Sequence, residues 1–306
     1  MINDKTYMRR CLQLAANGIQ EARPNPMVGA VIVADRRIIG EGYHVRCGEG
    51  HAEVNAFASV RSEDEPLLPE STIYVSLEPC SHYGKTPPCA DLIISKAVKR
   101  VVVGCIDPFA KVQGRGIEKI RQAGIEVTVG ILEQECQWLN RRFFTYHSKH
   151  RPYIILKWAQ TANGFIDDHF QPLTISNEQT QMLSHQLRAE EDAILVGHTT
   201  FNRDQPRLDV RHWHGSKPRR IVLTHDRPLP QLMDDLYQHG VQSLIVEGGR
   251  QTHESFLQAG LWDELRIETN HLLMVSDGTH APQLPAQGRL RSHQSYAGNN
   301  LEVYTK

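Results

Sequence analysis

Short apolar stretches alternate with stretches of helical periodicity along most of the chain, and this alternation restricts the fold more than any other feature. Apolar residues recur at helical spacing from Tyr7 to Ala15, and Gly18 follows as a stop signal. Further helices are predicted at His51–Val60, Pro88–Ala97 and Ile131–His147, and strands at Met27–Ala34, Ile38–Tyr43, Thr72–Leu77, Arg100–Cys105 and Val127–Val129. Strands and helices of these lengths in alternation form a sheet covered by helices, so we predict an α/β fold.

The charged stretch Ser148-Lys-His-Arg-Pro152 interrupts this pattern, and a second alternation follows it. Its helices are predicted at Asn177–Leu187 and Gln231–His239, and its strands at Tyr153–Trp158, Ala193–Val196, Arg220–Leu223, Ser243–Val246 and Leu265–Glu268. Ser176 with Gln179 forms a capping-box pattern at the start of the first of these helices. A chain of 306 residues is long enough for two domains, which we predict at 1–147 and 151–306.

Composition and charge exclude several classes of protein. Lys and Arg total 34 against 35 Asp and Glu, so no general basic field is available to hold nucleic acid. The 40% hydrophobic and 23% charged residues exclude intrinsic disorder and a collagen-like chain. No apolar run approaches the roughly 20 residues of a membrane span, and the six irregularly spaced cysteines do not suggest a secreted disulfide framework. We therefore expect a cytoplasmic protein with neither nucleic acid nor membrane as a partner.

Three candidate metal ligands and a carboxylate form the most informative local pattern. His51-Ala-Glu53 begins a predicted helix, Cys80 follows a strand, and Cys89 begins another helix. Zinc binds one imidazole and two thiolates readily, and three protein ligands leave the fourth tetrahedral position open for a water molecule. A carboxylate two residues beyond the ligand His can move protons to and from that water. The pattern is that of the zinc deaminases, with eight residues between the cysteines instead of two.

Two other interpretations of the same residues are open at this point. His51, Glu53 and the two cysteines could be an ordinary helix face with two buried thiols. A closed structural zinc site is the second alternative, with His82 or His44 as a fourth ligand, but Glu53 argues against it. The four remaining cysteines have no comparable partners, and we predict them to be small buried side chains.

The first half resembles a known family at Arg23–Gly29, Gly42–His44, His51–Glu53 and Glu78–Cys89. These stretches are similar to the bifunctional riboflavin-biosynthesis deaminase/reductases, in which a long Gly-Lys-Thr-Pro-Pro-Cys insert is typical. The resemblance implies a cytidine-deaminase-like three-layer domain followed by a dihydrofolate-reductase-like α/β domain. It implies one zinc ion per chain on His51, Cys80 and Cys89, proton transfer by Glu53, and a phosphorylated diaminopyrimidinone substrate contacted by Asn25, His44 and Lys85.

The second half resembles the reductase domain of the same family at Arg151–Gly164, Arg188–Thr200, Asp204–Leu208 and Val246–Gly249. The resemblance implies NADPH as cofactor and a role for Lys157 at the ribose hydroxyls or in proton transfer. The implied cofactor-binding residues are Gln160, Thr174, Thr200, Asp204, Gly249, Arg250 and Gln251, and the implied substrate-binding residues are Arg188, Leu208, Arg211 and Glu247. Independently, glycines that lead from a strand into a helix let backbone amides approach a phosphate, and arginines match phosphate oxygens bidentately.

Two residues depart from the family pattern. Asn163 stands where the turn often carries Asp, and Thr174 stands where many members have an aromatic residue. A reductase half that has lost its activity is therefore one alternative. A nucleic-acid or nucleoside deaminase with a fused accessory domain is another, and a non-catalytic zinc-stabilised binding or scaffold protein is a third. We expect a bifunctional enzyme that deaminates the pyrimidinone at a zinc site and then reduces the ribosyl group to ribityl with NADPH. We also expect a homo-oligomer.

Overall fold

The structure is a computed structural model that describes residues 4–81, 87–108, 113–224 and 226–306. The chain divides into two compact units, Met1–Lys149 and His150–Lys306. The division falls inside the charged stretch that interrupts the sequence pattern. Each unit has its own sheet and its own hydrophobic core, so the two are described one at a time.

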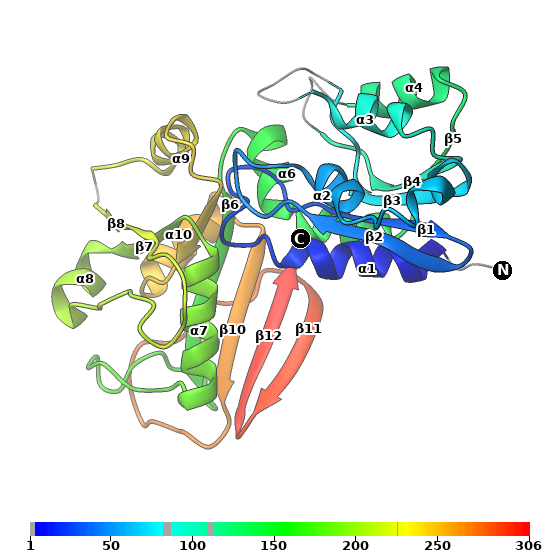
Figure 1. Ribbon diagram of the computed structural model, residues 1–306. Helices are drawn as coiled ribbons and strands as arrows, with labels where there is room; N and C mark the ends of the chain where they lie inside the picture. Colours follow the sequence, from blue (N-terminus) through cyan, green and yellow to red (C-terminus); the bar gives the residue numbers. More distant parts are fainter. Residues whose placement is uncertain (1–3, 82–86, 109–112, 225) are drawn as a thin grey trace. The chain divides into compact units, whose positions relative to one another are not determined.

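The described residues of the first unit form a five-stranded mixed sheet in the order β2-β1-β3-β4-β5 (Figure 1). Strand β1 pairs antiparallel with β2 and with β3, and β3, β4 and β5 run parallel. The strands are β1 (Gly29–Ala34), β2 (Arg37–Tyr43), β3 (Thr72–Leu77), β4 (Arg100–Cys105) and β5 (Glu126–Val129). The carboxyl ends of β3 and β4 therefore lie at one edge of the sheet, and the metal-ligand candidate Cys80 follows β3 there.

Helices cover both faces of this sheet, which makes the unit three layers deep. Ile73 and Val75 point into a core with α2 (Ala52–Ala58), α3 (Cys89–Ser95) and α4 (Arg115–Gln122). Tyr74 points to the other face, against α1 (Asp4–Ala16) and α5 (Glu133–Leu139), because successive side chains of a strand alternate between faces. This is the predicted three-layer arrangement. A 3₁₀ helix, Glu65–Glu70, precedes β3.

Two helices of the first unit differ from the sequence-based prediction. The single helix predicted at Ile131–His147 is interrupted at Asn140, which ends α5 and precedes α6 (Arg141–Lys149). Helix α4 was not predicted, because Gly114 and Gly116 at its start are poor helix formers and only Ile117 and Ile120 form an apolar stripe.

The described residues of the second unit form a seven-stranded sheet in the order β11-β12-β10-β6-β9-β7-β8 (Figure 1). Its parallel strands are β6 (Tyr153–Thr161), β7 (Ala193–Gly197), β8 (Arg219–Leu223), β9 (Ser243–Val246) and β10 (Glu264–Asn270). An antiparallel hairpin of β11 (Arg289–Tyr296) and β12 (Asn299–Thr305) extends one edge. The hairpin was not predicted because β11 is exposed along almost its whole length and lacks a clear apolar alternation.

Helices lie on both faces of the second sheet. Ile154 and Leu156 pack with α9 (Leu229–Gln238) and α10 (Arg250–Gln258), whereas Ile155 packs with α7 (Glu178–Glu190) on the opposite face. The short α8 (His198–Asp204) follows β7 directly. Both units are α/β, as the sequence predicts.

The capping box predicted at Ser176 is wrong. Asn177 is the N-cap of α7, and its Oδ1 accepts the backbone N–H of Thr180 at 3.0 Å. The hydroxyl of Ser176 instead donates to Glu268 at 2.7 Å, on the neighbouring strand β10. Asn caps helices as well as Ser does, so the tertiary contact of Ser176 decides which residue takes the position.

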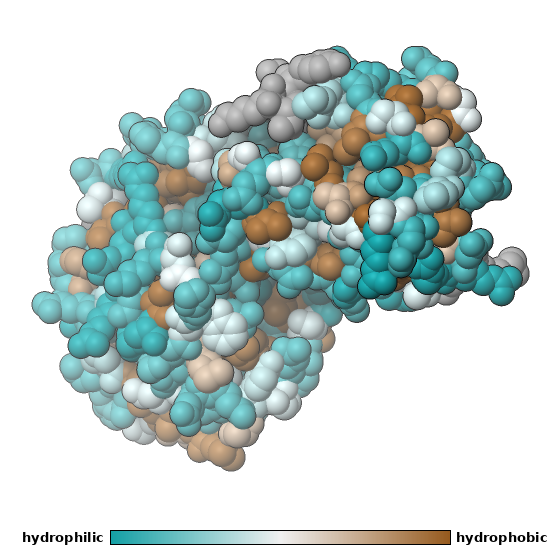
Figure 2. Space-filling view, in the orientation of Figure 1, coloured by the Kyte–Doolittle hydropathy of each residue, from teal (hydrophilic) through white to brown (hydrophobic). Residues whose placement is uncertain are grey.

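Hydrophilic residues cover most of the face seen in Figure 2, and hydrophobic residues appear there in small groups. Of the helices in the described ranges, none combines the length and the apolar character needed to cross a membrane.

Candidate active sites

The three predicted metal ligands come from three separate elements of the first unit and meet in space. His51 is the N-cap residue of α2, Cys80 follows β3, and Cys89 is the first residue of α3. The Nδ1 atom of His51 lies 3.5 Å from the Sγ of Cys80 and 3.3 Å from the Sγ of Cys89. Within the described ranges, this is the one group of three or more such side chains whose ligand atoms lie within 4.8 Å of one another.

These distances fit a tetrahedral zinc ion. Bonds of about 2.0 Å to nitrogen and 2.3 Å to sulfur place the two ligand atoms about 3.5 Å apart at a tetrahedral angle. The observed separations of 3.5 and 3.3 Å agree with this value. Hydrogen bonds from Cys89 and His51 lower the pKa of Cys80 to about 4, and the backbone N–H of Cys89 adds a donor at 3.3 Å. Cys80 is therefore preorganised to carry a thiolate, whereas its hydrogen bond with Cys89, together with burial, raises the pKa of Cys89.

Glu53 lies beside the trio, in the first turn of α2, and only 3% of its surface is exposed. Its carboxylate approaches the thiol of Cys89 within hydrogen-bonding reach. Burial, followed by the charge on Cys80, raises the pKa of Glu53 to about 7. A carboxyl group in this position can hold a proton or release it near neutral pH, which is the requirement for general acid–base work.

Asn25 and His44 form one wall beside the metal ligands. His44 lies edge-on to His51, with ring centroids 5.4 Å apart. Its Nδ1 lies 3.1 Å from the carbonyl oxygen of Gly50, and its Nε2 lies 3.0 Å from the amide nitrogen of Asn25. Burial lowers the pKa of His44, so the ring is neutral, donates from Nδ1 and accepts from Asn25. Lys85, predicted to bind the same substrate, and His82 lie outside the described residues.

Glu78 stabilises the backbone around the metal site. The sequence analysis did not identify this role, although the residue belongs to the Glu-Pro-Cys stretch. Its carboxylate is 4% exposed and accepts backbone N–H groups at 2.9 to 3.4 Å from Asp107, Gly114, Gly116 and Ile117. Three of these donors lie at the N-terminus of α4, where a negative charge is favourable. Because Cys80 is two residues further along, Glu78 fixes the point at which the chain enters the metal site.

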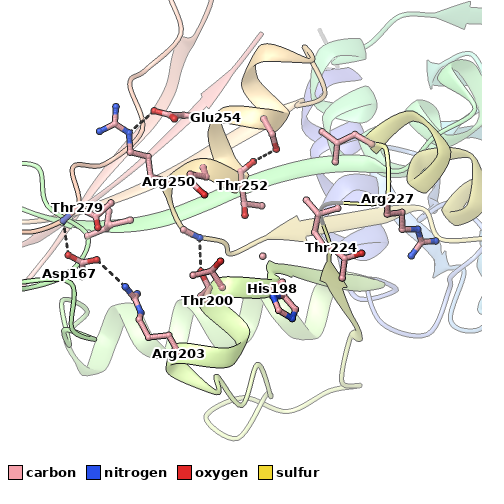
Figure 3. Close-up of a pocket in the computed structure, with 18 of the residues that line it drawn as sticks. Asp167, His198, Thr200, Arg203, Thr224, Arg227, Arg250, Thr252, Glu254 and Thr279 are labelled. Atoms are coloured by element: carbon pink, nitrogen blue, oxygen red, sulfur yellow. Dashed lines mark hydrogen bonds and ion pairs between the residues drawn. The ribbon is translucent and has the colours of Figure 1, made fainter.

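The second unit contains a cavity of about 740 Å³ at the carboxyl ends of β7, β8 and β9 (Figure 3). Ligands bind to open parallel sheets at this edge. Gly197 is the N-cap residue of α8 and Gly249 is the N-cap residue of α10, and both line the cavity. A Cβ atom at Gly248 would lie 2.7 Å from the Cβ of Thr252, so only glycine lets α10 start this close to the strand ends.

Four of the seven predicted cofactor residues line this cavity, and three do not. Thr200, Gly249, Arg250 and Gln251 line it, and the backbone N–H of Gly249 donates to the Thr200 hydroxyl at 3.2 Å. Gln160 lies on β6 and bonds to Trp158 and Thr269. Thr174 is exposed before α7, and Asp204 ends α8.

Charged residues that the sequence analysis missed surround the cavity. Arg203 donates to Asp204 and, at 3.4 Å, to the buried Asp167 (Figure 3). Asp167 also accepts the N–H of Thr279 at 2.7 Å. Asp167 follows the Asn163-Gly164 turn closely in sequence. An acidic residue just after that turn is the feature from which its place at the cavity could have been predicted.

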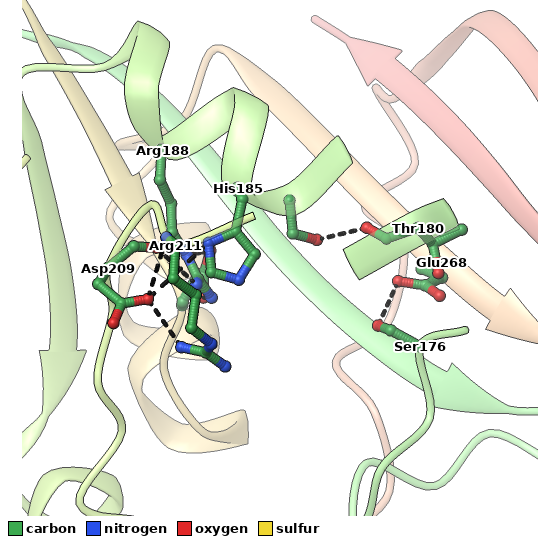
Figure 4. A network of polar contacts seen from close by, with 9 residues as sticks. Ser176, Thr180, His185, Arg188, Asp209, Arg211 and Glu268 are labelled. Carbon is green, nitrogen blue, oxygen red and sulfur yellow. Dashed lines mark hydrogen bonds and ion pairs between the residues drawn. The ribbon is translucent and has the colours of Figure 1, made fainter. Parts of the chain in front are cut away.

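The predicted substrate residues Arg188 and Glu247 form a buried bidentate pair. The guanidinium group donates to the two carboxylate oxygens at 3.1 and 2.6 Å, and both side chains are less than 15% exposed. Asp209 links this pair to Arg211 and His185, since its Oδ1 accepts from Arg211 at 2.7 Å and lies 3.9 Å from His185 (Figure 4).

Lys157 and Leu208, the other two predicted residues of this site, have different environments. Lys157 lies on β6, next to the pair. Burial acts to raise the pKa of Glu247, but the positive charges of Arg188 and Lys157 outweigh it and lower that pKa. Leu208 is 6% exposed and packs in the core with Leu187.

Asn163, one of the two residues that depart from the family pattern, has a defined role here. The Oδ1 of Asn163 accepts the Thr161 hydroxyl at 2.8 Å, and its amide donates to the carbonyl of Val275 at 2.7 Å. An Asp could not make the second bond, so Asn163 stabilises the turn after β6 in a way specific to an amide.

Comparison with known proteins identifies the two units. Residues 1–105 match the cytidine and deoxycytidylate deaminase zinc-binding region, and residues 152–231 and 228–294 match the RibD C-terminal domain. The riboflavin biosynthesis protein RibD of Aquifex aeolicus is 38% identical, over 86% of this chain and 86% of its own length. The chain belongs to the RibD family.

Other RibD proteins agree with this in sequence and in fold. RibD of Escherichia coli is 41% identical, with 94% of this chain and 93% of that protein covered. A solved structure from Thermotoga maritima has a TM-score of 0.90 and 32% identity, over 99% of this chain and 98% of that one. It is described as a diaminohydroxyphosphoribosylaminopyrimidine deaminase/5-amino-6-(5-phosphoribosylamino)uracil reductase. RibD of Acinetobacter baumannii has a TM-score of 0.88 and 29% identity.

As a RibD-family member, this chain is a bifunctional enzyme of riboflavin biosynthesis, with a zinc-binding deaminase domain and a reductase domain. The alternatives of a nucleoside deaminase with an accessory domain and of a non-catalytic zinc protein are thereby excluded.

Proposed function

We propose that the chain catalyses both reactions named for its Thermotoga maritima relative, in sequence. The first unit, near the predicted limits 1–147, hydrolyses the amine from the diaminopyrimidinone ring of the ribosylamino 5′-phosphate. The second, near 151–306, reduces the ribosyl group of the deaminated product to ribityl. The observation that supports this most directly is the meeting of His51, Cys80 and Cys89 with a buried Glu53 beside them.

In the deaminase unit, each residue has a part that follows from its position. His51, Cys80 and Cys89 would hold one zinc ion, and Glu53 would take a proton at its carboxylate and return it to the leaving amine. Zinc, when bound, lowers the pKa of a water ligand so that it can act as the nucleophile. Asn25 and the neutral His44 would bind the polar edge of the pyrimidinone, because they present an amide and an imidazole beside the ligands. Lys85 would add a cation for the phosphate.

In the reductase unit, the cavity at the strand ends would hold NADPH, which supplies the hydride. The N-terminus of α10, with Gly249, Arg250 and Gln251, offers backbone amides and partial positive charge to the cofactor phosphates. Thr200 would help to hold these amides in place. We propose that Gln160, Thr174 and Asp204 contact the cofactor outside the present boundary of the cavity.

The substrate of the reductase would lie beside the Arg188–Glu247 pair. Arg188 and Arg211 are suited to the sugar phosphate, and Leu208 and Glu247 would border the ring. Lys157 would hydrogen-bond the ribose hydroxyls or give a proton to the ring oxygen as the hydride reaches the first carbon of the sugar.

The test follows ammonia release and NADPH oxidation in one tube with the diaminopyrimidinone ribosylamino phosphate. We expect one NADPH oxidised per ammonia released. Glu53→Gln should abolish ammonia release while the same chain still reduces substrate that was deaminated beforehand. Glu63→Gln changes an exposed carboxylate of the same unit and serves as the matched control. Normal ammonia release by Glu53→Gln would refute the assigned chemistry.

Two further expectations complete the proposal. A cytoplasmic location is supported by the six cysteines, which are all free, since disulfides form in oxidising compartments. The homo-oligomer expected from the sequence stays a prediction, which size-exclusion chromatography with light scattering can test.

A further inference from the structure

We propose that Asn140 is a positioning residue for the deaminase substrate: it fixes the segment 22–28, which carries Asn25, while remaining outside the reacting groups. The inference rests on the proposed function, in which Asn25 binds the pyrimidinone. It concerns a residue at the junction of α5 and α6, more than a hundred positions from Asn25 in sequence.

The contact that carries the inference is a bidentate amide pair. The Oδ1 of Asn140 accepts the backbone N–H of Met27 at 2.8 Å, and its Nδ2 donates to the carbonyl oxygen of Met27 at 2.8 Å. Asn140 is 2% exposed and Met27 is 8% exposed. Both polar groups of one peptide position are thus satisfied by one side chain, where water cannot replace either bond.

No other residue of this size makes the same pair. An amide offers one acceptor and one donor in a plane, which matches the N–H and C=O of Met27. A carboxylate would keep the bond to the N–H but would place its second oxygen against the carbonyl oxygen. Ala or Leu would leave both groups of Met27 buried and unpaired, and the segment would have to move to find partners.

Asn140 is itself held firmly by its backbone. Its N–H donates to the carbonyl oxygen of Cys136 in α5 at 3.4 Å, and its carbonyl oxygen accepts the N–H of Phe144 in α6 at 2.9 Å. Met27 also packs with Ala15 and Ala22, and Leu139 borders this group. The side-chain amide therefore projects from a junction fixed by two helices, and it transmits that position to Met27.

From Met27 the constraint reaches both residues of the proposed substrate wall. Asn25 is two residues away, and its N–H donates to Ala22 at 2.9 Å. On the other side, the carbonyl oxygen of Val28 accepts the N–H of His44 at 2.9 Å. Since the Asn25 amide and the His44 ring meet at 3.0 Å, a shift of Met27 would separate them. The metal ligands lie on other elements, and His51 meets this path only through the edge-on contact of its ring with His44.

A double-mutant cycle on the full chain tests the inference with the pyrimidinone phosphate as substrate. Asn140→Ala should raise the deaminase KM about tenfold, because the loss in substrate-binding free energy should be roughly that of one net hydrogen bond. The deaminase kcat, the zinc content and the reductase activity should change less than about twofold. In the Asn25→Ala background, the same substitution should raise KM less than about twofold, because the residue it positions is already absent.

Two further variants sharpen the result. Asn17→Ala alters an exposed Asn of the same unit and should leave KM unchanged. Asn140→Asp keeps the shape and the bond to the Met27 N–H, and it gives the same readout if Asn140→Ala does not fold. An unchanged KM in a folded, zinc-loaded Asn140 variant would overturn the inference, as would an equal rise in both Asn25 backgrounds. Failure of the wild-type chain to release ammonia would refute the proposed function itself.

Discussion

Acid should destabilise the second unit through one buried histidine, His253 on α10. Its side chain is fully buried, and its ring packs on Trp158 with centroids 5.3 Å apart. Neither ring nitrogen makes a hydrogen bond of standard geometry to a described residue. Burial lowers the pKa of His253 to about 4, although the nearby carboxylate of Glu247 acts in the opposite direction. The folded unit therefore keeps this ring neutral.

The size of the effect follows from the two pKa values. A histidine in the unfolded chain titrates near 6.5, so the unfolded state binds a proton well before the folded state does. The stability is complete above about pH 6.5 and is lost as the pH falls towards 4. A difference of about 2.5 pH units corresponds to about 3 kcal/mol at low pH, of which about 2.5 kcal/mol is already lost at pH 4.5.

The assay compares the wild-type chain with His253→Leu, which is similar in volume and does not titrate. Hydrogen–deuterium exchange of the β6 and α10 peptides in increasing urea reports the second unit separately from the first. Between pH 7.5 and 4.5, the wild-type unit should lose about 2.5 kcal/mol more of its unfolding free energy than His253→Leu does. His239→Leu, at an exposed position of the same unit, should behave as the wild type. Equal losses in the wild type and His253→Leu would refute the reasoning.

Three other perturbations have defined outcomes. Removing zinc with a chelator should stop ammonia release and leave NADPH oxidation with the deaminated substrate unchanged; parallel loss of both activities would contradict separate sites. Glu78→Gln should lower the unfolding free energy of the first unit by about 4 kcal/mol in a urea titration, because about two of the four N–H groups, of which three are buried, lose their acceptor at roughly 1–3 kcal/mol each. An unchanged midpoint would show that the carboxylate does not carry these bonds. Gly249→Val would place side-chain atoms 3.1 Å or less from the Thr200 hydroxyl and over the cavity, so the Kd for NADPH in a fluorescence titration should rise at least about tenfold, while ammonia release stays normal.

Sequence reasoning identified the residues whose chemistry is written in a local pattern. His51, Cys80 and Cys89 were predicted together because their types and their positions at helix starts and strand ends indicate a metal site. Glu78 and Asn140 were not predicted, because their roles depend on the backbone groups that they bind. Those groups lie 29 to 113 residues away in sequence. Spacing contains no information of that kind.

Secondary structure follows the same division. Strands β3 and β4 are apolar throughout and were predicted with their observed limits, Thr72–Leu77 and Arg100–Cys105. The hairpin β11–β12 is a strand pair because it continues the sheet from β10, and little in its own polar sequence requires it. Asp167 and Arg203 were missed at the cavity for a related reason, since only the fold brings them within 3.4 Å.

Helix α10 connects the cavity to the core, so a ligand bound in the cavity would stabilise the whole second unit. The helix begins at the cavity with Arg250, Gln251 and Thr252, whereas Phe256, one turn later, is fully buried among the core residues. The unit cannot unfold without dismantling both. Any ligand that binds only the folded cavity therefore shifts the folding equilibrium, by about 2.7 kcal/mol at one hundred times its Kd. The tolerance of the reductase unit to heat and to acid would thus depend on the concentration of cofactor in the cell as well as on the sequence of the unit.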